Sequence, residues 1–272
     1  MRIAQDWHAT AFNQATESSN QIHSDEMAQA YGFKGALVPG VTVSSYLVHP
    51  AARAWGRDWL SRGMAHIEVN RPLYDGYPFD VTLTDVTDSS YRATLVDQEG
   101  THCATGVIRL NDEIPEPPVM RGDPVMKRNQ DIPPVSHDVL ERMAREGMHA
   151  LPARWSAEHN MSAYVADPGA MAPVHRFDGE GLANTAFMLG LTNWVLAGNT
   201  YMNPWVHIQT DSQYYAAVER DTDLLVECAI EDLFDKRGHQ FVDVMVDAYV
   251  RDTGGAVMST RLRAIYKLRP PG

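Results

Sequence analysis

The sequence predicts an α+β protein of two similar halves, each a long central helix wrapped by a curved antiparallel sheet. Three observations indicate this. Each half has one strongly apolar helical segment, each segment is followed by stretches in which apolar and polar residues alternate, and a proline-rich stretch separates the halves. A nearly all-apolar helix must be buried on most of its surface, and a sheet that curves around it provides that burial.

The boundary between the halves is a run of prolines. Six of the 16 prolines lie between Asp112 and Ser136, and proline cannot donate a backbone hydrogen bond to a sheet. We therefore expect a first domain over residues 1–112, a linker with a connecting helix over 113–150, and a second domain over 151–272. Two such halves can pair their sheets into one continuous sheet, which removes an exposed edge from each.

The first half begins with two helical segments. Ser24 is a candidate N-cap with acidic residues after it, and Gly32 ends this short helix. A second helix is expected to begin near Gly40, to kink or restart at Pro50, and to end near Gly63. The apolar period then changes from about 3.6 to 2, which predicts three or four strands. They cover residues 65–69, 79–83, 91–95 and 103–110.

The second half repeats this order after its own connecting helix, which Ser136 caps and Gly147 ends. Residues 182–197 form a strongly apolar helical segment, and Gly198 is its expected end. Strand patterns follow this helix, as they do in the first half. They cover residues 205–208, 224–230, 241–250 and 256–266.

A weak internal repeat supports the duplication. The pair His-Ile at 66–67 recurs at 207–208, and residues 96–100 align without a gap on residues 250–254. A long helix wrapped by a curved antiparallel sheet is the architecture called the hotdog fold. The sequence therefore predicts a double hotdog.

The composition excludes several classes of function. The 35 acidic residues outnumber the 23 basic ones, a net charge of −12, so we expect no nucleic-acid partner. The two cysteines lie far apart in strand-like stretches, which indicates buried thiols in a reducing cytoplasm. No signal peptide and no run of 18 apolar residues is evident, so we expect a soluble protein without a membrane partner. The histidines and cysteines show no metal-ligand spacing.

Two stretches of the first half carry motifs. Asn20, His23 and Asp25 precede a glycine-rich approach to the helix that begins near Gly40, and residues 70–76 read Asn-Arg-Pro-Leu-Tyr-Asp-Gly. Together they resemble the active-site segment and the Arg-Pro turn of the MaoC-like hydratases. These are hotdog-fold enzymes that add water to 2-enoyl thioesters of coenzyme A or acyl carrier protein.

The resemblance implies a pair of residues that hold one water. In the family, an aspartate and a histidine five positions apart add that water across the double bond, one as base and the other helping to deliver the proton. His23 matches the histidine and Asn20 the asparagine between them, but Ser18 stands at the aspartate position, with Glu17 beside it. A serine can orient water but cannot accept its proton at neutral pH.

Three interpretations of this site follow from the missing aspartate. In the first, His23 acts alone, with Glu17, or with a carboxylate from elsewhere, such as Asp167 or Asp178. In the second, the site serves thioester hydrolysis, in which water attacks the carbonyl. In the third, the site only binds its thioester.

The start of the second helix predicts a place for the thioester oxygen. The free N–H groups of Gly40 and Val41 can receive that oxygen as negative charge develops on it, and a glycine lets a ligand approach the backbone closely. The family usually has His-Gly-Met here, whereas this chain has a proline before Gly40. Lys34 is the nearest basic residue, expected either to meet a phosphate of the carrier or to be a solvated surface lysine.

Reserve candidates lie in the second half. His175, Asp178 and Asn184 precede or open its apolar helix much as His23 and Gly40 do in the first half. The stretch resembles in outline the Asp-x-x-Gly-x-x-Asn region of hotdog thioesterases. The same residue types are also what a loop and a helix N-terminus require.

The favoured function is therefore a hydratase or dehydratase, a carbon–oxygen lyase acting on an acyl-CoA or acyl carrier protein thioester. A hotdog thioesterase is the first alternative, and a non-catalytic module that binds acyl thioesters is the second. We expect no cofactor other than coenzyme A as part of the substrate, and a homodimer as the assembly.

Overall fold

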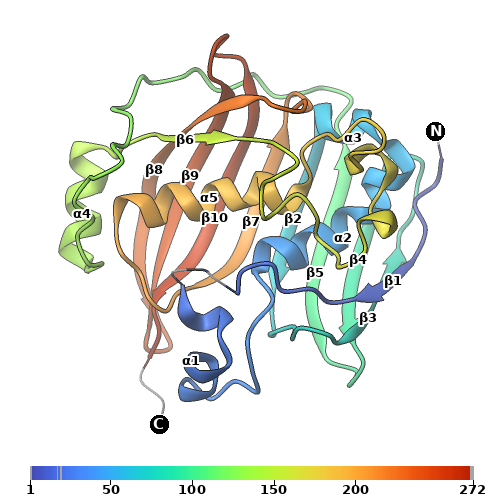
Figure 1. The fold of residues 1–272 in the computed structure, drawn as a ribbon, viewed down its shortest axis with the longest axis horizontal. Helices are drawn as coiled ribbons and strands as arrows, with labels where there is room; N and C mark the ends of the chain where they lie inside the picture. Colours follow the sequence, from blue (N-terminus) through green and yellow to red (C-terminus); the bar gives the residue numbers. More distant parts are fainter. Residues whose placement is uncertain (1, 17, 19, 270–272) are drawn as a thin grey trace.

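A computed structural model describes residues 2–16, 18 and 20–269 of the chain (Figure 1). The first half contains five strands, three α-helices and one 3₁₀ turn. In chain order these are β1 (Trp7–Thr10), η1 (Gln21–His23), α1 (Asp25–Ala30), α2 (Gly40–Trp55), α3 (Arg57–Arg62), β2 (Gly63–Val69), β3 (Pro78–Thr84), β4 (Ser90–Asp97) and β5 (His102–Leu110).

The rest of the chain contains a connecting helix and then the same kinds of element again. In chain order these are α4 (His137–Glu146), β6 (Leu151–Arg154), η2 (Pro168–Ala170), η3 (Pro173–His175), α5 (Thr185–Asn199), β7 (Val206–Tyr214), β8 (Asp223–Lys236), β9 (His239–Val250) and β10 (Ala256–Lys267). Among the described residues, no helix is both long and apolar enough to span a membrane.

All ten strands form one antiparallel sheet, in the order β1-β3-β4-β5-β2-β7-β10-β9-β8-β6. The two halves of this order mirror each other, and they meet where β2 pairs with β7. The helices α2 and α5 lie next to each other against one face of the sheet (Figure 1). Most side chains of both helices are buried, as the apolar segments predicted. This is the expected double hotdog architecture.

Backbone hydrogen bonds repeat between the halves. Just before α2, the N–H of Val38 donates to the oxygen of Leu73, and just before α5 the N–H of Ala183 donates to the oxygen of Val218. The same connection therefore anchors the start of each central helix to the loop between the first two strands that follow it, β2 and β3 in the first half and β7 and β8 in the second. This repetition indicates a duplicated unit more clearly than the amino-acid letters do.

The His-Ile repeat was a wrong match. His66 lies on the face of β2 opposite the buried Ala65 and Ile67, whereas His207 is buried against the helices. Since successive residues of a strand point to opposite faces, these two histidines are not equivalent. The match of residues 96–100 with residues 250–254 is structurally equivalent, because the first stretch spans the β4–β5 turn and the second spans the β9–β10 turn.

The central helices differ from expectation at their ends. α2 continues through Pro50 and ends at Trp55, and the break falls instead at Gly56, whose φ is +54°. α5 continues past Gly198, where an added Cβ would lie 2.7 Å from the sulfur of Met126. That glycine therefore permits close packing rather than ending the helix.

Candidate functional site

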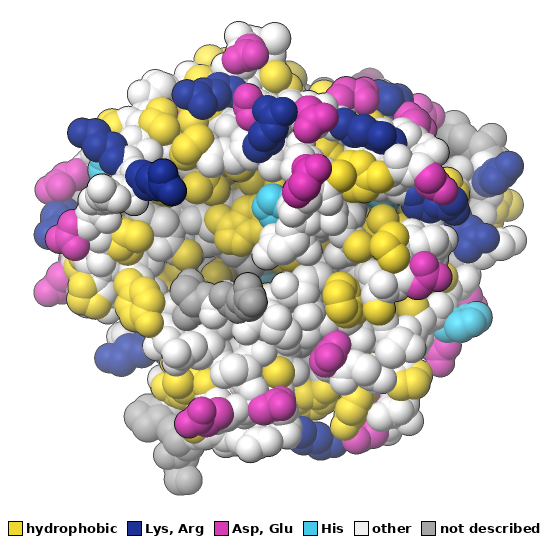
Figure 2. Space-filling view, in the orientation of Figure 1, with side chains coloured by type: hydrophobic (Ala, Val, Ile, Leu, Met, Phe, Trp, Pro, Cys, Tyr) yellow, Lys and Arg dark blue, Asp and Glu magenta, His cyan; other side chains and the backbone are white. Residues whose placement is uncertain are grey.

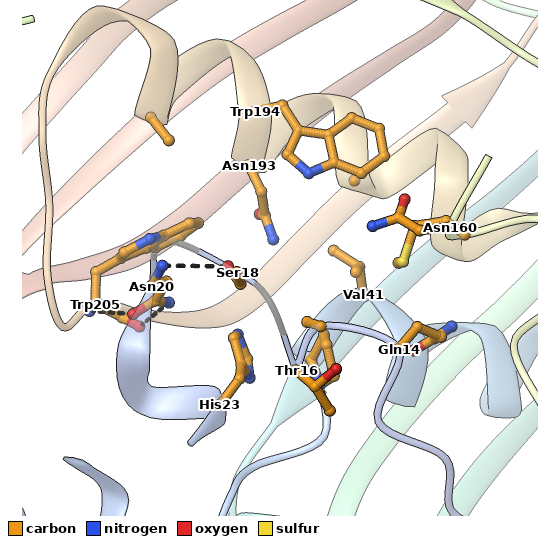
Figure 3. Close-up of a pocket in the computed structure, with 15 residues that line it drawn as sticks. Gln14, Thr16, Ser18, Asn20, His23, Val41, Asn160, Asn193, Trp194 and Trp205 are labelled. Atoms are coloured by element: carbon orange, nitrogen blue, oxygen red, sulfur yellow. Dashed lines mark hydrogen bonds between the residues drawn. The ribbon is translucent and has the colours of Figure 1, made fainter. Parts of the chain in front are cut away.

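Three hollows meet at His23, which lines all of them. The amide hollow, about 420 Å³, is lined by Gln14, Thr16, Ser18, Asn20, Asn160, Asn193, Trp194 and other residues (Figure 3). The apolar hollow, about 270 Å³, is lined mainly by Ile22, Phe33, Leu37, Val43, Leu73 and Ile208 with their neighbours. The outer hollow, about 470 Å³, is lined by Asp25, Lys34, Tyr74, Asp75 and neighbours. Figure 2 shows one face of the molecule hollowed near its middle, with apolar side chains around the opening.

His23 is held by one hydrogen bond of its ring. Its Nδ1 lies 2.7 Å from the backbone oxygen of Leu37, and because a carbonyl oxygen only accepts, Nδ1 carries the proton. Burial lowers the pKa of His23, although the bond to Leu37 opposes that shift. The ring is therefore neutral at neutral pH, and Nε2 keeps a lone pair with no hydrogen-bond partner among the described residues. This nitrogen can accept a proton from a bound water.

No carboxylate of the described residues lines the amide or the apolar hollow. Ser18 is exposed and lines the amide hollow, where its Oγ accepts from the N–H of Asn20. Glu17 lies outside the described residues. In the outer hollow, Asp25 accepts from the N–H of Ala36, and Asp75 accepts from the N–H of Asn13.

The two distant carboxylates do not line any of these hollows. Asp167 caps the turn η2 by accepting from the N–H of Gly169. Asp178 is paired with Arg176 at the surface, and that contact lowers its pKa. Among the described residues, His23 is therefore the only titratable side chain that faces both the amide hollow and the start of α2.

Asn20 joins the two halves. Its Nδ2 donates to the oxygen of Trp205 at 2.9 Å, and its Oδ1 accepts from the N–H of Trp205 at 3.3 Å (Figure 3). The side chain is buried, and both of its polar atoms are engaged by the backbone. This geometry favours a role in fixing the turn η1, and with it His23, against the second half.

The start of α2 presents two free backbone donors. Gly40 and Val41 open the helix, and neither N–H has a hydrogen-bond partner among the described residues, since the proline before them provides no side-chain cap. Gly40 lines the apolar hollow and Val41 lines the amide hollow. Each of these two residues therefore shares one hollow with His23.

The reason for a glycine at position 40 differs from the expected one. A Cβ at Gly40 would lie 3.1–3.2 Å from ring atoms of His207, a distance tighter than ordinary van der Waals contact. A side chain of the second half therefore occupies the side of this glycine where a Cβ would lie.

Lys34 lines the outer hollow and is paired with Glu99, which lies in the turn between β4 and β5. Its pKa is raised by the hydrogen bond to that carboxylate. Both side chains are largely exposed, so the pair stays accessible to a charged ligand.

The reserve candidates do not share the hollows of His23. His175 is buried, its Nδ1 donates to the oxygen of Leu182 at 3.1 Å, and burial lowers its pKa to about 4. Asn184 is the N-cap of α5, since its Oδ1 accepts from the N–H of Phe187 at 3.1 Å. Asn184 thus has the helix-capping role that the sequence left as the simpler interpretation.

Sequence reasoning missed the residues that the second half contributes. Asn193, Trp194 and Trp205 line the amide hollow, and His207 lines the apolar hollow. One signal was present, because Asn193 is a polar amide within a nearly all-apolar helical segment. Such a residue needs a hydrogen-bond partner or a function.

Within residues 2–16, 18 and 20–269, no group of three or more His, Cys, Asp or Glu side chains could hold a metal ion. Cys103 and Cys228 are both free and buried, and burial raises the pKa of each thiol to about 12. Neither thiol is a nucleophile at neutral pH.

Solved structures of similar fold cover nearly the whole chain. A protein from Mycobacterium tuberculosis described as having a double hotdog fold matches with 13% identity and a TM-score of 0.57, over 97% of this chain and 96% of that one. A MaoC-like dehydratase matches with 11% identity and a TM-score of 0.55, over 98% and 99%. A candidate thioesterase II from Thermobifida fusca matches with 15% identity and a TM-score of 0.53, over 98% and 95%.

No family model matches the sequence, and no curated protein matches it. At these identities the structural matches establish the fold, and the chain is a double hotdog protein.

Proposed function

We propose that the protein is a MaoC-like enzyme that adds water to a 2-enoyl thioester, or removes water from a 3-hydroxyacyl thioester. The observation that carries this proposal is the state of His23. Its Nδ1 is committed to Leu37, so Nε2 is an unprotonated base at the point where three hollows meet. Gly40 and Val41, which carry the free N–H groups at the start of α2, each share one of these hollows with His23.

The reaction can be written with these groups alone. Nε2 of His23 takes a proton from water as the water oxygen bonds to C3 of the enoyl group. The electrons of the C2=C3 bond move onto the thioester oxygen, which the N–H groups of Gly40 and Val41 stabilise. The proton then passes from His23 to C2, which gives the 3-hydroxyacyl thioester, and dehydration is the reverse.

The hollows suggest how the substrate is arranged. The apolar hollow suits the acyl group, whereas the amide hollow suits the polar arm of coenzyme A or of acyl carrier protein. The absence of an aspartate at Ser18 leaves one proton acceptor where the family has two. General acid–base catalysis contributes about 10² to 10⁴ in rate, so we expect slow turnover.

A thioesterase remains the first alternative, favoured by the same lone base. Water activated by His23 would attack the carbonyl carbon, and Gly40 and Val41 would hold the oxyanion. A module that binds acyl thioesters without turnover is the second alternative. We also expect a cytoplasmic homodimer, which light scattering on the purified protein and localisation of a tagged chain would test.

One experiment separates the three functions. The protein is incubated with crotonyl-CoA and, separately, with saturated acyl-CoA thioesters. Loss of the enoyl absorbance indicates hydration, release of free thiol indicates hydrolysis, and binding without either change indicates the module. The absence of turnover and of binding with every thioester would contradict all three.

A further inference from the structure

The second half contributes a linked pair of polar residues to the site. Nδ1 of His207, on β7, lies 3.1 Å from Oδ1 of Asn193, on α5. An amide oxygen only accepts, so Nδ1 of His207 carries the proton, and the amide NH₂ of Asn193 has no hydrogen-bond partner in the part of the chain that the structure describes. Figure 3 shows the nitrogen of Asn193 pointing into the amide hollow, on the side where His23 lies.

His207 also touches the start of α2. Its ring atoms lie 3.1–3.2 Å from the position that a Cβ at residue 40 would take. One imidazole thus lies against both the residue that opens α2 and the amide of Asn193. Asn193 shares the apolar hollow with Gly40 and the amide hollow with Val41.

His207 cannot supply charge at neutral pH. It is buried, its Nε2 has no hydrogen-bond partner among the described residues, and burial lowers its pKa to about 4. A neutral ring with one committed N–H acts by orientation, since it fixes which end of the Asn193 amide faces the hollow.

We propose that the NH₂ group of Asn193 donates a hydrogen bond to the thioester oxygen of the substrate, and that His207 is the positioning residue that turns the amide toward it. This inference rests on the proposed function. The oxyanion site would then be built from both halves, with the backbone donors of Gly40 and Val41 from the first and a side-chain donor from the second. A donor held in place before the reaction stabilises developing negative charge without reorganisation.

The arrangement accounts for an otherwise costly feature. A buried imidazole costs free energy unless its N–H is hydrogen-bonded, and the half-buried Asn193 provides the acceptor for that of His207. The bond between them satisfies one atom of each, and leaves the NH₂ of Asn193 directed at the space where the substrate carbonyl would lie. A purely structural asparagine has no need of a free donor at that place.

Acetoacetyl-CoA provides a test that needs no turnover, because its enolate absorbs in the near ultraviolet and reports stabilisation of an oxyanion. We expect the wild-type protein to increase the enolate absorbance on binding, and Asn193→Leu to bind the ligand with most of that signal lost. His207→Phe, which keeps the packing against Gly40 but not the N–H, should lose part of the signal. Asn129→Leu, at an exposed position outside the three hollows, should retain it.

The isosteric variant Asn193→Asp separates a donor from a structural residue. Its carboxylate cannot donate at neutral pH, but the protonated carboxyl group can, so the enolate signal, taken as a fraction of the wild-type signal at the same pH, should rise as the pH falls. With a reactive thioester, Asn193→Leu should lower kcat by about 10²-fold, the usual effect of losing one oxyanion donor.

The outcomes distinguish this inference from the proposed function. An enolate signal that depends on Asn193, without turnover of crotonyl-CoA, supports the inference and contradicts the hydratase. Turnover or an enolate signal that Asn193→Leu leaves unchanged overturns the inference. So does a wild-type protein that binds acetoacetyl-CoA without any enolate signal, or that fails to bind it.

Discussion

His23 and His175 hold equivalent places in the two halves. Each ends a 3₁₀ turn, and each donates from Nδ1 to the carbonyl of a leucine three residues before the central helix. Their surroundings differ, because His175 is buried and His23 lines three hollows. The duplicated unit therefore has an imidazole in both halves, and His23 lines the hollows whereas His175 does not.

The pair provides a matched test of catalysis. His23→Gln removes the proposed base but retains a side chain able to bond Leu37, so we expect kcat for crotonyl-CoA to fall by about 10² to 10⁴. His175→Gln is the control and should lower the melting temperature without a comparable change in kcat. Equal losses of kcat in both variants, with folding intact, would show that His23 has no special role.

The rate should depend on pH in a direction that burial sets. The pKa of His23 is lowered from its ordinary value of 6.5, and the proposed mechanism needs the neutral ring. The neutral fraction therefore stays high as the pH falls past 6.5, and kcat/KM should decline only below that value. The profile of kcat/KM against pH measures this, and an acid limb centred above 6.5 would contradict it.

The fold could be predicted from the sequence because its main signals are local. The apolar run of residues 182–197 predicts a buried helix, and the alternation after it predicts half-buried strands. Both predictions depend only on neighbouring residues and not on distant parts of the chain. The edge strands β1 and β6 were missed, since each has only four residues. Four residues are too few for a clear alternation.

The candidate site could be predicted from the sequence only in part. The sequence pointed to His23 and Gly40 because they lie in one motif of the first half, and both line the apolar hollow. Asn193 and His207 reach the same place through the packing of α5 and β7 against α2. No spacing in the sequence encodes such a contact, and the apparent repeat of His66 as His207 matched residues on opposite faces of the sheet.

Asn20 should matter for stability as well as for activity. Asn20→Leu removes two buried hydrogen bonds to Trp205 and leaves that backbone unpaired, so we expect a loss of about 1–3 kcal/mol in the free energy of unfolding. Because η1 is then less firmly held, kcat should also fall. Urea denaturation measures the first effect, and initial rates with crotonyl-CoA measure the second.

Gln21→Ala is the control for that variant, since its side chain accepts one exposed hydrogen bond from Asn203 at the same junction. It should change the free energy of unfolding by less than about 0.5 kcal/mol. An Asn20→Leu protein as stable as the wild type, with normal kcat, would contradict a role of Asn20 in stability and in activity.

The ion pair of Lys34 and Glu99 offers a test of how the carrier binds. If Lys34 meets a phosphate of coenzyme A, Glu99 competes for it. Glu99→Gln should then lower KM for crotonyl-CoA and Lys34→Met should raise it, each by roughly twofold to fivefold, the usual scale of an exposed charge pair. Crotonyl-pantetheine, which lacks the phosphates, is the matched control substrate. Its KM should be the same in both variants, whereas shifts as large as those for crotonyl-CoA would mean that Lys34 acts on the shape of the outer hollow and not on the phosphates.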